Sequence, residues 1–199
     1  MKKTILLVFL TLVSVLLINR INEMNENLYT PEIKRPKQIN YLKIDFDRFK
    51  QINKDVIGWL IIKDTDINYP VLKTNNNEFY ITHNFDLTEN KKGSIFQDYK
   101  NISLNDKNIT LYGNNLNKGM FADLRKIYNQ ELGNDIYIKL ITETNIYTYK
   151  VYETIKNNIV SEFDYQIDIT DEDYIINLKS IGGTYEYVVK AIRIEEEEC

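Results

Sequence analysis

One cysteine and one histidine are the only residues of the sequence that could form a thiol–imidazole pair for nucleophilic catalysis. Cys199 is the last residue and follows the four glutamates of Glu195–Glu198. Nearby carboxylates raise the pKa of a thiol and suppress the thiolate, so this cysteine is a poor nucleophile. His83 is the only candidate for an imidazole base. The glutamate run is most simply a solvated chain end, and we predict neither a metal site nor a cofactor.

The stretch Asn108–Phe121 has the pattern of a site built at the end of a strand. A short apolar strand ends at Gly113, a polar turn with Asn114 and Asn115 follows, and a helix begins near Met120. A rigid sheet aims the side chains at its strand ends into a cleft. We therefore expect the functional site at this turn, although an Asn-Asn pair is also ordinary turn material.

Four other segments carry short motifs that form an ordered series with this stretch. They are Gly58-Trp59, Tyr69-Pro70-Val71, Asn77–Phe85 and Gly93–Tyr99. The series resembles class B sortases, the cysteine transpeptidases of Gram-positive cell walls. The resemblance implies a fold that is mainly β with small helices, a sortase-type mixed β-barrel. In that family the histidine at the position of His83 belongs to a structural segment, so a packing or hydrogen-bonding role is expected for it.

The resemblance also implies a catalytic site made of three groups. A thiolate attacks the threonine carbonyl of a sorting signal, a histidine protonates the leaving amine, and an arginine holds the oxyanion. At the corresponding positions this sequence has Asn114 for the histidine, Ile181 for the cysteine and Glu186 for the arginine. An amide does not titrate near neutral pH and cannot act as a general acid. No catalytic residue is therefore predicted to be intact.

Other polar side chains near these positions are candidates for lining a groove: Asp98, Tyr112, Asn115, Lys179 and Ser180. Ser180 is next to Ile181, but strand alternation turns it to the other face, and no histidine is placed to activate it. Glu186 can pair with a lysine across the strands.

The pair Gly182-Gly183 indicates a two-residue hairpin between the strand patterns Tyr174–Ile181 and Thr184–Ile194. That register sets Lys179 opposite Glu186. It also removes the longer loop that borders the substrate groove in class B sortases, so the groove is expected to be closed at this end. The pocket beside Asn114 is then expected to be shallow and lined by Ile181, Lys179 and Glu186.

Local patterns predict the remaining elements of the domain. Asp45 can cap a docking helix at about 45–54, and strands are expected at 58–62, 67–72, 136–140 and 146–154. Class B sortases insert a long helical excursion that forms one wall of the substrate groove. The segment Ile155–Tyr174 has no apolar period of 3.6 residues, so we predict that this excursion is deleted.

The N-terminal residues have the pattern of a membrane anchor. Lys2 and Lys3 precede an apolar run from Thr4 to Ile18, and neither alanine nor glycine occurs before Gly58. A cleaved signal peptide needs small residues at its cleavage site, so an uncleaved anchor is favoured over cleavage. The lysines ahead of the run favour a cytoplasmic N-terminus.

The predicted organisation is therefore a signal anchor at 1–20, a polar stalk at 21–40 and a sortase-like barrel domain at 41–199. The protein is expected in the cell membrane as a single-pass protein with an extracytoplasmic C-terminal domain. The net charge is −4 and the charges are spread along the chain, so the sequence has no cluster of basic residues that would indicate nucleic-acid binding.

Three functional interpretations stay open. The first is a catalytically inactive class B sortase homologue that binds a sorting-signal peptide or another protein of the cell wall or sortase system. The second is an active cysteine transpeptidase with an unrecognised nucleophile. The third is a decayed paralogue without a selected role.

Overall fold

The computed structural model describes residues 44–199, except residue 117 and residues 164–168. The predicted anchor at 1–20 and stalk at 21–40 lie outside the described residues, and the domain boundaries stay a prediction. In the described part of the chain, no helix combines the length and apolar character needed to cross a membrane.

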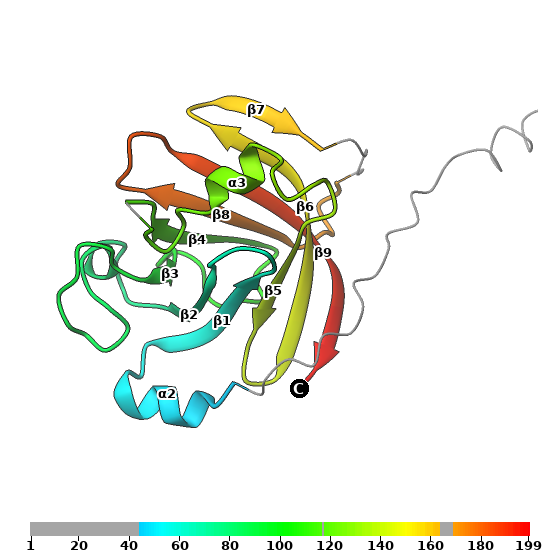
Figure 1. Ribbon diagram of the computed structural model, residues 1–199. Coiled ribbons are helices and arrows are strands. Elements are labelled where there is room, and N and C mark those ends of the chain that lie inside the picture. The colour runs from blue at the N-terminus through cyan, green and yellow to red at the C-terminus, as the bar shows by residue number, and fades with distance from the viewer. Residues whose placement is uncertain (1–43, 117, 164–168) are drawn as a thin grey trace, which may run out of the picture. The chain divides into compact units, whose positions relative to one another are not determined.

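Eight strands close into a mixed β-barrel, as Figure 1 shows. The order around the barrel is β5-β1-β2-β3-β4-β8-β9-β6, and β6 pairs with β5 to close it. The pairs β2–β3 and β4–β8 are parallel, and the other pairs are antiparallel. The predicted fold, mainly β with small helices and built on a mixed β-barrel, is confirmed. The barrel strands are β1 (Val56–Ile62), β2 (Asn68–Leu72), β3 (Ile95–Gln97), β4 (Asn108–Asn114), β5 (Tyr137–Ile141), β6 (Asn145–Lys156), β8 (Ile175–Ile181) and β9 (Tyr187–Glu198).

The barrel interior is filled by apolar side chains from all eight strands. In β1 and β8 every second residue is buried, because successive side chains of a strand point to opposite faces. The short helix α3 (Leu124–Tyr128) buries Leu124 and Ile127 in the same core. Phe121, which precedes the helix, is also fully buried and packs against Gly113 at the end of β4, where a Cβ atom would meet the phenyl ring at 2.8 Å.

A second apolar cluster lies on the outside of the barrel, where the helix α2 (Phe46–Ile52) packs on β1. Asp45 caps this helix, since its side chain accepts a hydrogen bond from the backbone N–H of Arg48 at 3.0 Å. The predicted docking helix is thus confirmed, with bounds shorter than 45–54. The short 3-10 helix η1 (Phe79–Ile81) adds Tyr80 to this outer cluster.

The segment between β6 and β8 holds one further strand, β7 (Ile159–Glu162), which pairs only with β6 at the edge of the sheet (Figure 1). The described residues of Ile155–Tyr174 contain no helix, while 164–168 lie outside the described part. The helix expected from Met120 begins later, at Leu124, because turns occupy the residues just before it.

The predicted two-residue hairpin between β8 and β9 is wrong. Strand β8 ends at Ile181 and β9 begins at Tyr187, so residues 182–186 form the connection. Lys179 pairs with Val188 and Leu178 with Val189, a register two residues away from the predicted one. Side chains from outside the hairpin hold the longer loop, as described below.

Candidate functional site

Asn114 and Ile181 lie side by side at the ends of two parallel strands. They are direct partners in the pairing of β4 with β8, and the backbone N–H of Asn115 donates to the carbonyl of Ile181 at 3.0 Å. Tyr112 and Lys179 are partners two residues earlier, so these four side chains share one face of the sheet. This face is the outer one, because Tyr112 and Ile181 pack on the outer cluster. We call it the outer site.

The amide of Asn114 is buried and makes one hydrogen bond within its own turn and one to a distant segment. The residue is only 3% exposed. Its Nδ2 donates to the carbonyl of Lys91 at 3.1 Å, and its Oδ1 accepts from the backbone N–H of Leu116 at 2.7 Å. Gly182 packs on the same amide with φ +80°, a conformation that side chains other than glycine rarely adopt. Asn114 is therefore a fixed part of the turn and offers no proton to a reaction.

The polar groups of the outer site pair with one another. The hydroxyl of Tyr112 donates to Asp98 Oδ2 at 2.9 Å, and Lys179 Nζ lies 3.3 Å from Glu186 Oε1. Burial, the hydrogen bond to Asp98 and the negative charges of Asp98 and Glu186 raise the pKa of Tyr112 to about 12. Burial alone would raise the pKa of Asp98, but hydrogen bonds from Lys100, Tyr112 and Asn77 hold it below its ordinary value. The predicted ion pair of Lys179 with Glu186 exists, although the two residues are not direct cross-strand partners.

Two candidates, Ser180 and Asn115, lie on the other side of the strands. Ser180 is fully buried on the interior face of β8, as alternation predicts. Its Oγ accepts hydrogen bonds from the backbone N–H of Tyr187 at 2.8 Å and from Asn115 Nδ2 at 3.0 Å. Asn115 Nδ2 also donates to the carbonyl of Tyr185 at 2.7 Å. Ser180 is thus a structural hydrogen-bonding residue and not an exposed nucleophile.

The loop 182–186 is held by contacts from three separate segments. Asn115 binds Tyr185 from the turn after β4, and Lys179 binds Glu186 from β8. Asn157, at the β6–β7 turn, donates its backbone N–H to the carbonyl of Glu186 at 3.0 Å and accepts the Glu186 N–H on its Oδ1 at 2.9 Å. Gly183 fits against Asn115, since a Cβ atom there would lie 1.9 Å from Oδ1. These long-range contacts explain why the loop is longer than the local sequence suggests.

Cys199 lies at the far end of β9 from the outer site. Its backbone N–H donates to the carbonyl of Thr144, in the turn between β5 and β6, at 2.8 Å. The strand begins at Tyr187 and ends at Glu198, a length of about 36 Å at roughly 3.3 Å per residue. The thiol therefore cannot reach Asn114 or Ile181 within one molecule.

His83 has a packing role in the structure. Its ring stacks on Phe79 with 4.0 Å between the ring centroids, and Nδ1 lies 2.9 Å from the carbonyl of Phe79. The backbone carbonyl of His83 accepts a hydrogen bond from Ser94 Oγ at 2.9 Å. These contacts agree with the expected packing and hydrogen-bonding role.

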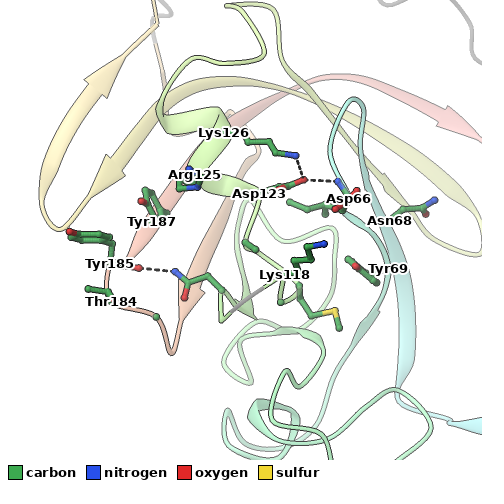
Figure 2. Close-up of a pocket in the computed structure, with 16 residues that line it drawn as sticks. Asp66, Asn68, Tyr69, Lys118, Asp123, Arg125, Lys126, Thr184, Tyr185 and Tyr187 are labelled. Carbon is green, nitrogen blue, oxygen red and sulfur yellow. Dashed lines mark hydrogen bonds and ion pairs between the residues drawn. The ribbon is translucent and has the colours of Figure 1, made fainter.

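A pocket of about 990 Å³ opens beside the site, with a lining that differs from the predicted one. It lies between the β1–β2 turn, the segment from Asn115 through α3, and the loop 182–186, as Figure 2 shows. Neither Asn114 nor Ile181, Lys179 or Glu186 is among its lining residues. Its charged lining residues are Asp66, Lys118, Asp123, Arg125 and Lys126, and its aromatic ones are Tyr69, Tyr185 and Tyr187.

Sequence reasoning missed this pocket because its walls come from three segments that are distant in the sequence. The cationic residues on the face of the short helix, Arg125 and Lys126, were the one signal that could have indicated it. In the part of the chain that the structure describes, no group of three or more His, Cys, Asp or Glu side chains could hold a metal ion.

Comparisons with known proteins agree with this fold. The chain is 32% identical over 158 residues to sortase B of Listeria monocytogenes, an alignment that covers 76% of the chain and 64% of that protein. The crystal structure of Clostridium perfringens sortase B matches with a TM-score of 0.64 and 27% identity, over 75% of the chain and all of that structure. The chain belongs to the class B sortase family. A Staphylococcus aureus sortase B–substrate complex matches with a TM-score of 0.64 and 26% identity, over 75% of the chain and 84% of that structure.

Membership of the class B sortase family does not by itself carry the activity over to this chain. The chain spans slightly less than two thirds of the length of its Listeria relative. No family model matches the sequence. The assignment of Asn114, Ile181 and Glu186 to the histidine, cysteine and arginine positions of the family stays a prediction.

Proposed function

We propose that this protein is a catalytically inactive class B sortase that binds a peptide on its outer site without cleaving it. The observation that carries the proposal is the pair formed by Asn114 and Ile181 at the ends of β4 and β8. A cysteine transpeptidase needs a thiolate and a general acid at adjacent positions. Here the neighbouring side chains are an amide held by hydrogen bonds with Lys91 and Leu116 and an aliphatic group.

The rest of the outer site supports the same proposal. Glu186 brings a negative charge, which would destabilise an oxyanion, and Lys179 pairs with it at 3.3 Å. Neither Ser180 nor Cys199 can replace the missing nucleophile within one molecule, because Ser180 is buried and Cys199 lies at the far end of β9. The barrel nevertheless keeps the strands β4 and β8 and their shared outer face, on which a peptide can lie.

The peptide that we propose is a sorting signal or a segment of another protein of the sortase system. A Staphylococcus aureus sortase B of the same fold is described in complex with its substrate. We further propose that the chain is anchored by residues 1–20 in the cell membrane, with the barrel on the extracytoplasmic side. The lysines ahead of the apolar run support this orientation.

The experiment that tests the proposal measures binding and turnover on the same sample. The full-length protein in detergent is mixed with a sorting-signal peptide and an amine acceptor, and products are followed by chromatography. An active class B sortase treated in the same way is the positive control. We expect binding of the peptide by calorimetry and no cleaved or transferred product.

Turnover that disappears in a Cys199→Ala variant would overturn the proposal and favour an active transpeptidase that uses the terminal thiol of another molecule. Absence of both binding and turnover would favour the third interpretation, a decayed paralogue. The variant Lys179→Gln, which removes a cation from the outer site, is expected to weaken binding if the peptide lies there.

A further inference from the structure

The pocket beside the loop 182–186 carries cationic side chains that no described residue neutralises. Lys118 and Arg125 have no ion-pair or hydrogen-bond partner for their side chains among the residues that the structure describes. Both are exposed to the pocket and solvent. On the outer site, by contrast, Lys179 pairs with Glu186. Unpaired cations that line a concave surface are typical of a site for an anionic ligand.

The remaining charges of the pocket limit the charge of that ligand. Asp123 is occupied, because its Oδ2 pairs with Lys126 Nζ at 2.9 Å and accepts the backbone N–H of Asp66 at 2.8 Å, as Figure 2 shows. The three cationic side chains and the two carboxylates, including that of Asp66, leave one net positive charge. A ligand with a single negative charge fits this balance, whereas the two carboxylates repel a polyanion.

The shape and walls of the pocket favour a peptide over a small inorganic anion. Its volume of about 990 Å³ lies at the upper end of the usual range for ligand sites, roughly 300–1,000 Å³. Tyr69, Met120 and Tyr185 supply apolar surface to its lining. Nearby backbone N–H groups are already used, since those of Phe121 and Ala122 donate to carbonyls within the turn. The pocket thus offers side-chain cations and aromatic surface rather than the backbone cradle of a phosphate site.

We propose that this pocket binds a peptide segment that carries one carboxylate, with Lys118 and Arg125 as its anchors. The carboxylate accepts charge-assisted hydrogen bonds from the guanidinium of Arg125 and the ammonium of Lys118. Apolar side chains on either side of it contact Tyr69, Met120 and Tyr185. The site is separate from the outer site, and the inference does not rest on the proposed function.

The test uses the full-length protein in detergent and the probe N-acetyl-Leu-Glu-Leu-amide, whose only charge is the glutamate carboxylate. Binding is measured by calorimetry and compared with the probe in which glutamine replaces glutamate. We expect the glutamine probe to bind at least about tenfold more weakly. Lys118→Gln and Arg125→Gln are each expected to weaken binding of the glutamate probe by a similar factor. Both positions are exposed, so thermal unfolding is expected to stay unchanged in these variants.

Matched controls are Lys54→Gln and Arg48→Gln, two exposed cations outside the pocket. They remove the same charge from the protein and are expected to leave the affinity unchanged. Equal binding of the two probes, no binding of the glutamate probe, or equal losses in the control variants would overturn the inference. Competition by inorganic phosphate at the concentration of the peptide would overturn the assignment to a carboxylate.

Discussion

Replacing Asn114 by histidine, the residue that the family resemblance implies at this position, is expected to destabilise the protein. The asparagine amide is 3% exposed and makes two hydrogen bonds, one to the carbonyl of Lys91 and one from the N–H of Leu116. Gly182 packs directly on it, with a Cβ position 3.0 Å from Nδ2. An imidazole is larger than this amide and cannot reproduce both hydrogen bonds in the same place.

The magnitude follows from these two losses. Each intramolecular hydrogen bond contributes about 0.5–1.5 kcal/mol net. Overpacking of a filled site costs about 1–3 kcal/mol, and the imidazole can restore part of one hydrogen bond. We therefore expect Asn114→His to lower the free energy of unfolding by about 2–4 kcal/mol. For a chain of this length that corresponds to a fall in Tm of roughly 5–15 °C.

The assay is thermal and denaturant unfolding of the full-length protein, followed by circular dichroism. Asn129→His is the matched control, because Asn129 is exposed and its side chain binds, among the described residues, only Glu131, at 2.9 Å. The control is expected to stay within about 0.5 kcal/mol of the wild type. An Asn114→His variant as stable as the wild type would refute the reasoning, since it would show that the turn still has room for the family's histidine.

Three further predictions test the loop, the outer site and the anchor. Asn115→Ala removes two hydrogen bonds and is expected to cost about 1–2 kcal/mol and to speed hydrogen exchange in residues 182–186, whereas unchanged exchange would show that Asn115 does not hold the loop. Because the pKa of Tyr112 is raised from 10.0 to about 12, its protonated form stabilises the fold fully below pH 10 and less as the pH rises toward 12. Tyr112→Phe should therefore flatten the alkaline loss of stability in denaturant titrations, and an identical pH dependence in the variant would contradict this. The protein is expected to fractionate with membranes at full length, and a soluble species that begins after residue 18 would contradict the anchor.

The parts of the fold that depend on local patterns could be predicted from the sequence. Asp45 and the apolar face behind it indicated α2, and the alternation of apolar residues indicated β8 with Ser180 turned inward. The motif at Tyr112-Gly113-Asn114 placed the end of β4 at Gly113, one residue before its observed end at Asn114. Each of these features is decided by residues that are close together in the sequence, so a short window contains the necessary information.

The loop 182–186 and the pocket could not be predicted in this way. Gly182-Gly183 is a strong local signal for a tight hairpin, but Asn115 and Asn157 bind the loop from other segments and shift the register by two residues. A shift of two residues keeps every side chain on its expected face, which is why Lys179 still meets Glu186. The loop and α3 both contribute residues to the wall of the pocket. The wrong prediction of the hairpin therefore also led to a wrong prediction of the residues that line the pocket.

Intact-mass spectrometry of the full-length protein with a sorting-signal peptide tests the claim of catalytic inactivity most directly. A working cysteine transpeptidase accumulates a covalent acyl-enzyme when no amine acceptor is present. We expect a single species at the mass of the unmodified chain, under conditions in which an active class B sortase forms the adduct. An adduct that hydroxylamine releases and that maps to Cys199 would contradict it.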